Sequence, residues 1–133
     1  MKKFTSESQK TGEIGENIAC RYLSSKGFTI IERNYTRRCG EIDIIAQKKG
    51  VIHFIEVKSI VAYKFWEKEI LNTIRPEENM HAQKIRRLRS VIVSYLSEKD
   101  SEDNALWKFD VLTVVLDPEE KKAKAEMIED VIL

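Results

Sequence analysis

The chain has 133 residues, of which 42% are hydrophobic and 34% are charged, and its formal net charge is +1. This length predicts one compact domain over residues 1–133, with a core that needs no disulfide or metal cross-links, and the composition is typical of a globular protein. Because the charges nearly balance, a polyanionic partner must be sought in how they are arranged, not in their sum.

The N-terminal segment Met1–Glu7 is basic at its start, but no apolar run follows it, so it is not a secretory signal peptide. No stretch of the chain approaches the roughly 18 apolar residues of a membrane-spanning helix. We therefore expect a cytoplasmic protein without a membrane partner.

A first helix is predicted from about Ser8 to Lys26, because apolar residues recur on one side at about 100° per residue. Gly27 occupies the expected C-cap position. Three strands are predicted to follow, over Phe28–Tyr35, Glu41–Ala46 and Val51–Lys58. The third is mostly apolar and is therefore expected to be central in a sheet.

The second half of the chain begins with a weakly patterned segment, residues 60–75. A second helix is expected to begin between Pro76 and Asn79 and to end near Leu96. A strand over Trp107–Leu116 and an edge strand over residues 121–128 complete the order α-β-β-β-α-β-β. This order predicts an α/β fold with a central mixed β-sheet flanked by α-helices.

Two carboxylates and a lysine on adjacent predicted strands carry the clearest chemical signal, namely Asp43, Glu56 and Lys58. Hydrolysis of a phosphodiester requires a divalent cation to neutralise the phosphate and activate water, and such a cation prefers hard oxygen ligands. A cationic side chain near the attacking water lowers the pKa of that water and stabilises developing charge. The three residues supply these functions.

The register of the hairpin decides whether the two carboxylates meet. Closure at the pair Ala46/Val51 or Gln47/Gly50 makes Glu56 a diagonal neighbour of Asp43 on the same face. Closure at Gln47/Val51 turns Asp43 to the other face, so that a β-bulge would be needed. A salt bridge from Lys58 to either carboxylate is the ordinary structural alternative to catalysis.

Two helical residues are candidates to complete the site. Glu16 lies at the edge of the apolar stripe of the first helix, where it would complete a metal site or position water. Lys84 falls inside the apolar sector of the second helix and requires an anion, which is a site carboxylate, Asp110 or a substrate phosphate. The alternatives are a glutamate at a helix margin and a lysine that extends to solvent.

Local surpluses of arginine mark candidate nucleic-acid-binding residues, because the planar guanidinium suits phosphate contacts. They are Arg33, Arg37 and Arg38 before Asp43, and Arg86 and Arg87 on the second helix. The alternative is a solvated charged face.

An ordered set of motifs spans nearly the whole chain. It comprises Gly12–Ala19, Tyr22-Leu23, Gly27-Phe28, Glu32–Tyr35, Gly40–Ile45, Phe54–Lys58, Lys84 and Phe109–Val111. This set resembles the uncharacterised bacterial YraN-type family of the PD-(D/E)XK nuclease superfamily, which is similar to archaeal Holliday-junction resolvases. The resemblance implies a restriction-endonuclease-like core, Mg²⁺ or Mn²⁺ as cofactor, and a homodimer by analogy with the resolvases.

The resemblance also implies roles for particular residues. Asp43, Glu56 and Lys58 correspond to the D…ExK signature, Glu16 to a first-helix glutamate of resolvase-like members, and Lys84 to a helix residue that follows ExK. Ile42 stands where the superfamily name has proline, a position that commonly varies in this family. Residues 60–75 depart from the expected pattern, because they do not match a segment with Arg and Gly.

The leading hypothesis is a metal-dependent endonuclease acting on nucleic acid, DNA in preference to RNA, with branched or single-stranded substrates as candidates. Asp43, Glu56 and Glu16 are the predicted metal ligands, and Lys58 and Lys84 are the predicted catalytic lysines. One alternative is a nucleic-acid-binding module of the same fold with weak or partner-dependent activity. Another is a structural protein in which these residues form an ion-pair network.

Overall fold

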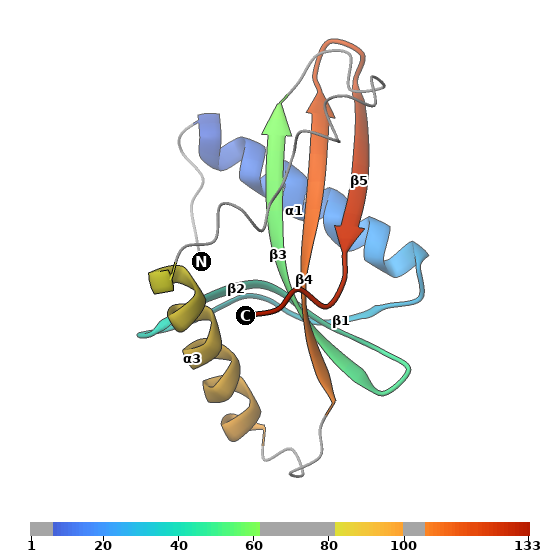
Figure 1. The fold of residues 1–133 in the computed structure, drawn as a ribbon. Helices are drawn as coiled ribbons and strands as arrows, with labels where there is room; N and C mark the ends of the chain where they lie inside the picture. Colours follow the sequence, from blue (N-terminus) through green and yellow to red (C-terminus); the bar gives the residue numbers. More distant parts are fainter. Residues whose placement is uncertain (1–6, 62–81, 100–105) are drawn as a thin grey trace.

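A computed structural model describes residues 7–61, 82–99 and 106–133. Its elements are α1 (Glu7–Ser25), β1 (Thr29–Arg37), β2 (Gly40–Lys48), β3 (Val51–Val61), α3 (Ala82–Glu98), β4 (Trp107–Asp117) and β5 (Lys122–Ile128) (Figure 1). The predicted order of helices and strands is confirmed. The predicted helix start between Pro76 and Asn79 lies outside the described residues, as do residues 62–75 of the weakly patterned segment.

The strands form one five-stranded sheet in the order β1-β2-β3-β4-β5. Its neighbouring strands are antiparallel, except for β3 and β4, which are parallel. Parallel neighbours require a crossover, and α3 lies in the chain between these two strands. The predicted α/β fold, a central mixed sheet flanked by helices as in a restriction-endonuclease-like core, is confirmed.

The end predicted for β3 at Lys58 is wrong, because the strand continues to Val61. Its last residues pair with β4 as far as Val61 opposite Leu116. This pairing partner is distant in the sequence, so the weak local pattern after Lys58 gave no sign of it.

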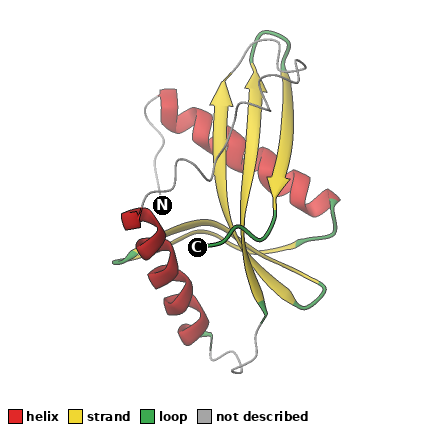
Figure 2. Ribbon diagram, in the orientation of Figure 1, coloured by secondary structure: helices red, strands yellow, loops and turns green. Residues whose placement is uncertain are grey.

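Helices α1 and α3 cover opposite faces of the sheet (Figure 2). On one face, α1 packs against a buried cluster that includes Ile55 and Leu112. On the other, α3 packs against a cluster that includes Phe54 and Val111. Consecutive strand residues thus pack into different clusters, as the alternation of side chains along a strand requires. Within the described segments, neither helix has the length and apolarity needed to cross a bilayer.

The β2–β3 hairpin closes at Lys48 opposite Val51, so none of the three expected closing pairs is correct. Lys49 and Gly50 form the connection, with φ of 51° and 77°. Positive φ at both central residues is characteristic of the two-residue type I′ turn, whose twist matches that of the strands. The last pair of this register is Ile44 opposite Ile55, so Asp43 and Glu56 are the residues that directly follow the paired part on the two strands.

Gly15 permits the close approach of α1 to β3. A Cβ atom at this position would lie 1.8 Å from Ser59 Oγ and 2.8 Å from Ser59 Cβ. Rotation of the Ser59 side chain would relieve only the first contact. The glycine therefore sets the distance between the helix and the strand, and with it the position of the neighbouring Glu16.

We expect Gly15→Ala to destabilise the protein by about 1–3 kcal/mol, the usual cost of overpacking, although alanine is the better helix former. Gly12→Ala is the matched control, because a Cβ there meets nothing within 4 Å. In a Ser59→Gly background, Gly15→Ala should no longer destabilise. Urea unfolding of the single and double variants measures these differences, and equal effects of Gly12→Ala and Gly15→Ala would show that the contact is unimportant.

Candidate active site

Asp43 lies at an irregularity in β2. Ile42 and Ile44 pack into opposite core clusters, although residues two apart on a regular strand share a face. On the adjacent strand β1, Asn34 has a φ of 52°, in the left-handed region that asparagine tolerates better than most residues. The backbone is therefore turned out of regular strand geometry beside Asp43.

The same point is a fork, at which β2 separates from β3. Backbone pairing of the two strands ends at Ile44 opposite Ile55. Beyond it, the Val57 N–H donates to Asp43 Oδ2 at 2.8 Å. The carboxylate thus replaces the missing strand partner of β3.

The surroundings of Asp43 disfavour its negative charge. Burial raises the pKa of this carboxyl to about 7, against the opposing effect of the Val57 N–H, and the charges of Glu16, Glu56 and Glu41 raise it further. Desolvation combined with like charges is a recurrent property of functional sites. Sequence reasoning gave Glu41 no role, although its position two residues before Asp43 places it near.

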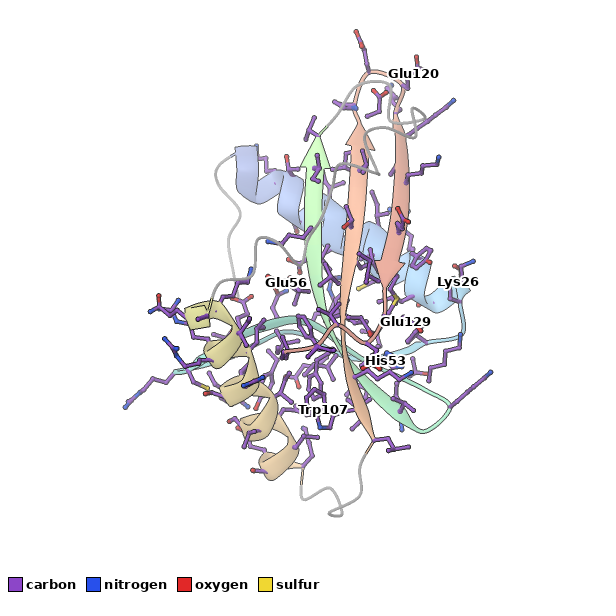
Figure 3. The ribbon with its side chains drawn as sticks, viewed as in Figure 1. Lys26, His53, Glu56, Trp107, Glu120 and Glu129 are labelled. Atoms are coloured by element: carbon purple, nitrogen blue, oxygen red, sulfur yellow. The ribbon has the colours of Figure 1, made fainter. Side chains whose placement is uncertain are left out.

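Glu56 is held by Lys84 from the first turn of α3. The Lys84 Nζ atom lies 2.6 Å from Glu56 Oε1, and the side chains are 29% and 16% exposed, respectively. Glu56 Oε2 is buried and has no hydrogen-bond partner among the described residues. Figure 3 shows Glu56 on β3, on the side of that strand where α3 lies. Of the three anions expected to pair with Lys84, the structure shows a carboxylate of the candidate site, that of Glu56.

Lys58 lies beside this ion pair. Burial lowers its pKa, the charge of Glu56 opposes that effect, and the adjacent Lys84 lowers the pKa further. The pKa of Lys84 is pulled down by burial, but its hydrogen bond to Glu56 and the charge of that residue outweigh burial and raise it. Lys84 therefore keeps its proton more firmly than an ordinary lysine, and Lys58 gives its proton up more readily.

Glu16 is buried on α1, as the apolar stripe predicted, whereas Glu13 is exposed. It lines a cleft of about 600 Å³ together with Thr11, Gly12, Asp43, Val57, Ser59 and Val61. Arg33 Nη2 lies 3.9 Å from Glu16 Oε1 and donates to Asn17 Oδ1 at 2.9 Å. The cleft thus brings Glu16 of α1 and Asp43 of β2 together, whereas Glu56, Lys58 and Lys84 do not line it and are linked to Asp43 through the mutual influence of their charges.

Two of the predicted metal ligands, Asp43 and Glu56, fit a small divalent cation. They are hard oxygen donors, one with a destabilised charge and the other with a buried oxygen that lacks a hydrogen-bond partner within the described segments. Mg²⁺ commonly binds one or two carboxylates and keeps waters or substrate phosphates as its other ligands. Among residues 7–61, 82–99 and 106–133, no three His, Cys, Asp or Glu side chains converge as a metal-binding group, so Glu16 does not form a three-carboxylate set here.

The predicted nucleic-acid-binding arginines divide into two groups. Arg33 is engaged with Asn17 and Glu16, and Arg37 makes a two-pronged contact with Glu98, with Nε and Nη2 each 2.7 Å from a carboxylate oxygen. All five side chains are exposed, but Arg38, Arg86 and Arg87 make no contact with a carboxylate among the described residues. These three are therefore the better placed for phosphate contacts.

A buried polar pair was not foreseen from the sequence. His53 Nδ1 bonds to Asp110 Oδ2, and Asp110 Oδ1 accepts a hydrogen bond from the Asp130 N–H at 2.9 Å. Asp110 was a candidate partner for Lys84 and is instead committed to His53 and the C-terminal segment. The pair joins two strands that no local pattern connects.

The mixed sheet with helices on both faces and an Asp–Glu–Lys cluster at a strand fork defines an α/β protein with a restriction-endonuclease-like core. The chain belongs to the uncharacterised protein family UPF0102, whose model matches residues 15–114. This is the YraN-type family that the motifs indicated, so that expectation is confirmed.

Curated relatives of similar length carry the same family description. A UPF0102 protein of Caldicellulosiruptor bescii is 31% identical over 122 residues, covering 92% of this chain and 96% of the relative. One of Alkaliphilus metalliredigens is 38% identical over 114 residues, covering 86% and 92%. One of Helicobacter pylori strain P12 is 36% identical over 131 residues, covering 98% of both chains.

Proposed function

We propose that this protein is a divalent-cation-dependent endonuclease that hydrolyses nucleic-acid phosphodiester bonds, with DNA preferred to RNA and branched or single-stranded DNA as candidate substrates. The observation that carries the proposal is that Asp43 lies at the β2–β3 fork with a pKa raised to about 7, close enough to Glu56 and Lys58 for their charges to act on one another. Burying carboxylates beside one another costs free energy, and a bound cation would offset that cost.

Asp43 and Glu56 would hold Mg²⁺ or Mn²⁺ through their carboxylates. The cation would neutralise charge on the scissile phosphate and lower the pKa of an attacking water. The Val57 N–H fixes Asp43 for this role, because it binds one carboxylate oxygen and so orients the other.

Lys58 is the residue best suited to handle the proton of the attacking water. Its lowered pKa, caused first by burial, makes the neutral amine more accessible than in an ordinary lysine. Glu16, across the cleft, would orient water through its carboxylate. The exposed residues Arg38, Arg86 and Arg87 would contact substrate phosphates away from the scissile bond.

One observation favours the alternative of a binding module with weak or partner-dependent activity. Lys84 already neutralises Glu56, and a permanent ion pair would leave only Asp43 for a cation. Cleavage and binding must therefore be measured separately.

The test is cleavage of labelled DNA and RNA, including single strands, flaps and four-way junctions, with Mg²⁺ or Mn²⁺ and with EDTA. We expect cation-dependent cleavage by the wild type, and a loss of at least about a hundredfold in Asp43→Ala and Lys58→Ala. Lys124→Ala, at an exposed lysine of β5, is the matched control and should cleave normally. Binding without cleavage by all proteins would favour the binding module, and equal cleavage by wild type and both site variants would contradict the proposed site.

A further inference from the structure

The contact between Lys84 and Glu56 joins helix α3 to strand β3 at the candidate site. Glu56 is fixed on the central strand β3, whereas Lys84 extends from the first turn of α3. The ammonium is 2.6 Å from one oxygen of a carboxylate whose other oxygen is buried and has no hydrogen-bond partner in the described parts of the chain. One positive charge thus lies against the carboxylate that the proposed cation requires.

A divalent cation and this ammonium cannot both bind Glu56 without a large mutual repulsion. Like charges a few ångströms apart repel strongly in a partly buried site, so the cation either binds weakly or displaces the ammonium. A lysine is suited to such an exchange, because its compact charge sits on a flexible stem of four carbons. Lys58 lies beside Lys84, so an anion bound by Lys84 would lie next to both lysines.

We propose that Lys84 is an exchangeable counter-ion, which neutralises Glu56 in the cation-free protein, leaves it when a divalent cation binds, and then pairs with a substrate phosphate beside Lys58. The proposal rests on the proposed function, since it assumes the same cation and substrate. It makes Lys84 a positioning residue that couples cation binding to substrate binding. The ion pair that favoured a binding module is then the resting state of the enzyme.

The first test is the affinity for Ca²⁺ or Mn²⁺ alone, measured by calorimetry at neutral pH without nucleic acid. Lys84→Met removes the competing charge and keeps much of the apolar stem, so it should bind the cation about tenfold or more tightly than the wild type. Lys84→Arg, which keeps the charge, should not. Arg89→Met removes an exposed charge from the same helix and should change the affinity less than about threefold.

The second test is binding of a fluorescent single-stranded oligonucleotide, in saturating Ca²⁺ and in EDTA. In Ca²⁺ the released ammonium contacts phosphate, so Lys84→Met should weaken binding about tenfold. In EDTA the ammonium is held by Glu56, so the same substitution should have less than about a threefold effect. The difference between the two conditions is the signature of exchange, because a purely structural lysine would affect both equally.

The outcomes separate this inference from the proposed function. Unchanged or weaker cation binding by Lys84→Met, or equal loss of oligonucleotide binding in Ca²⁺ and EDTA, would overturn the exchange while leaving the endonuclease in place. A wild-type protein that binds neither cation nor oligonucleotide would overturn both. Circular dichroism and thermal unfolding of each variant establish that the fold is retained.

Discussion

Asp43→Asn is expected to reduce cleavage by roughly 10³-fold and, in the same protein, to increase the stability of the cation-free state. The loss of activity follows because the amide provides no negative charge for the cation, and stabilisation of this kind contributes several kcal/mol to phosphoryl transfer. The gain in stability follows because the pKa of Asp43 is raised to about 7 by burial and by the neighbouring carboxylates.

The gain in stability from Asp43→Asn increases as the pH rises. In the unfolded chain an aspartate has a pKa of about 3.9, so the folded protein binds the extra proton between that pH and about 7. The contribution of Asp43 to stability is therefore full below the unfolded pKa and is lost as the pH rises through the folded pKa. Asp43→Asn does not titrate, so its advantage over wild type should grow between pH 4 and 7, to on the order of 2–4 kcal/mol, and then level off.

Urea unfolding in EDTA at a series of pH values measures the stability difference, and the same substrate panel measures activity. Adding Ca²⁺ at pH 8 should stabilise the wild type and leave Asp43→Asn nearly unchanged. A variant that was less stable than wild type at pH 8 without cation would show that the carboxylate is held by favourable contacts, and that a strained metal site is the wrong interpretation.

Asp110→Ala is expected to lower the free energy of unfolding by about 1–3 kcal/mol for each buried hydrogen-bonding group that it leaves without a partner. Asp110 is fully buried and is bound both by His53 and by the Asp130 N–H. The Val131 N–H donates to the Phe109 carbonyl at 2.7 Å, so the same region fastens the C-terminal segment to β4. Truncation would leave His53 without its acceptor and loosen that segment.

Two substitutions calibrate this prediction. Asp110→Asn retains an acceptor for the Asp130 N–H and should cost less than Asp110→Ala. Asp130→Asn removes a charge at an exposed side chain with a φ of 57°, a conformation that asparagine tolerates, and should change stability by less than about 0.5 kcal/mol. Denaturant unfolding at neutral pH measures all three, and a change of less than about 1 kcal/mol for Asp110→Ala would mean that the pair contributes little to stability.

Local patterns were reliable where one face of an element meets the core. The apolar stripe of α1 placed Glu16 at its edge, and that side chain is buried in the structure. The apolar run of β3 placed it at the centre of the sheet, where it has neighbours on both sides. These predictions succeed because burial of apolar side chains imposes the period of the element on the sequence itself.

Register and strand length were less predictable. The turn at Lys49-Gly50 uses positive φ at both residues, and this shifted the pairing away from each of the closing pairs considered. The extension of β3 to Val61 depends on a parallel partner that lies beyond α3 in the chain. Both features depend on interactions that the local hydrophobic pattern does not encode.

The sequence by itself therefore determined the order of elements, the α/β class, the family and the set of charged residues that make up the candidate site. Only the tertiary structure decided how those charges are partnered, Lys84 with Glu56 and Asp43 with the Val57 N–H, and only it revealed the separate pair of His53 and Asp110. The physical reason is that a charge is attracted to whichever partner the packing of distant elements brings within a few ångströms. Its pKa likewise depends on burial, which belongs to the folded chain as a whole.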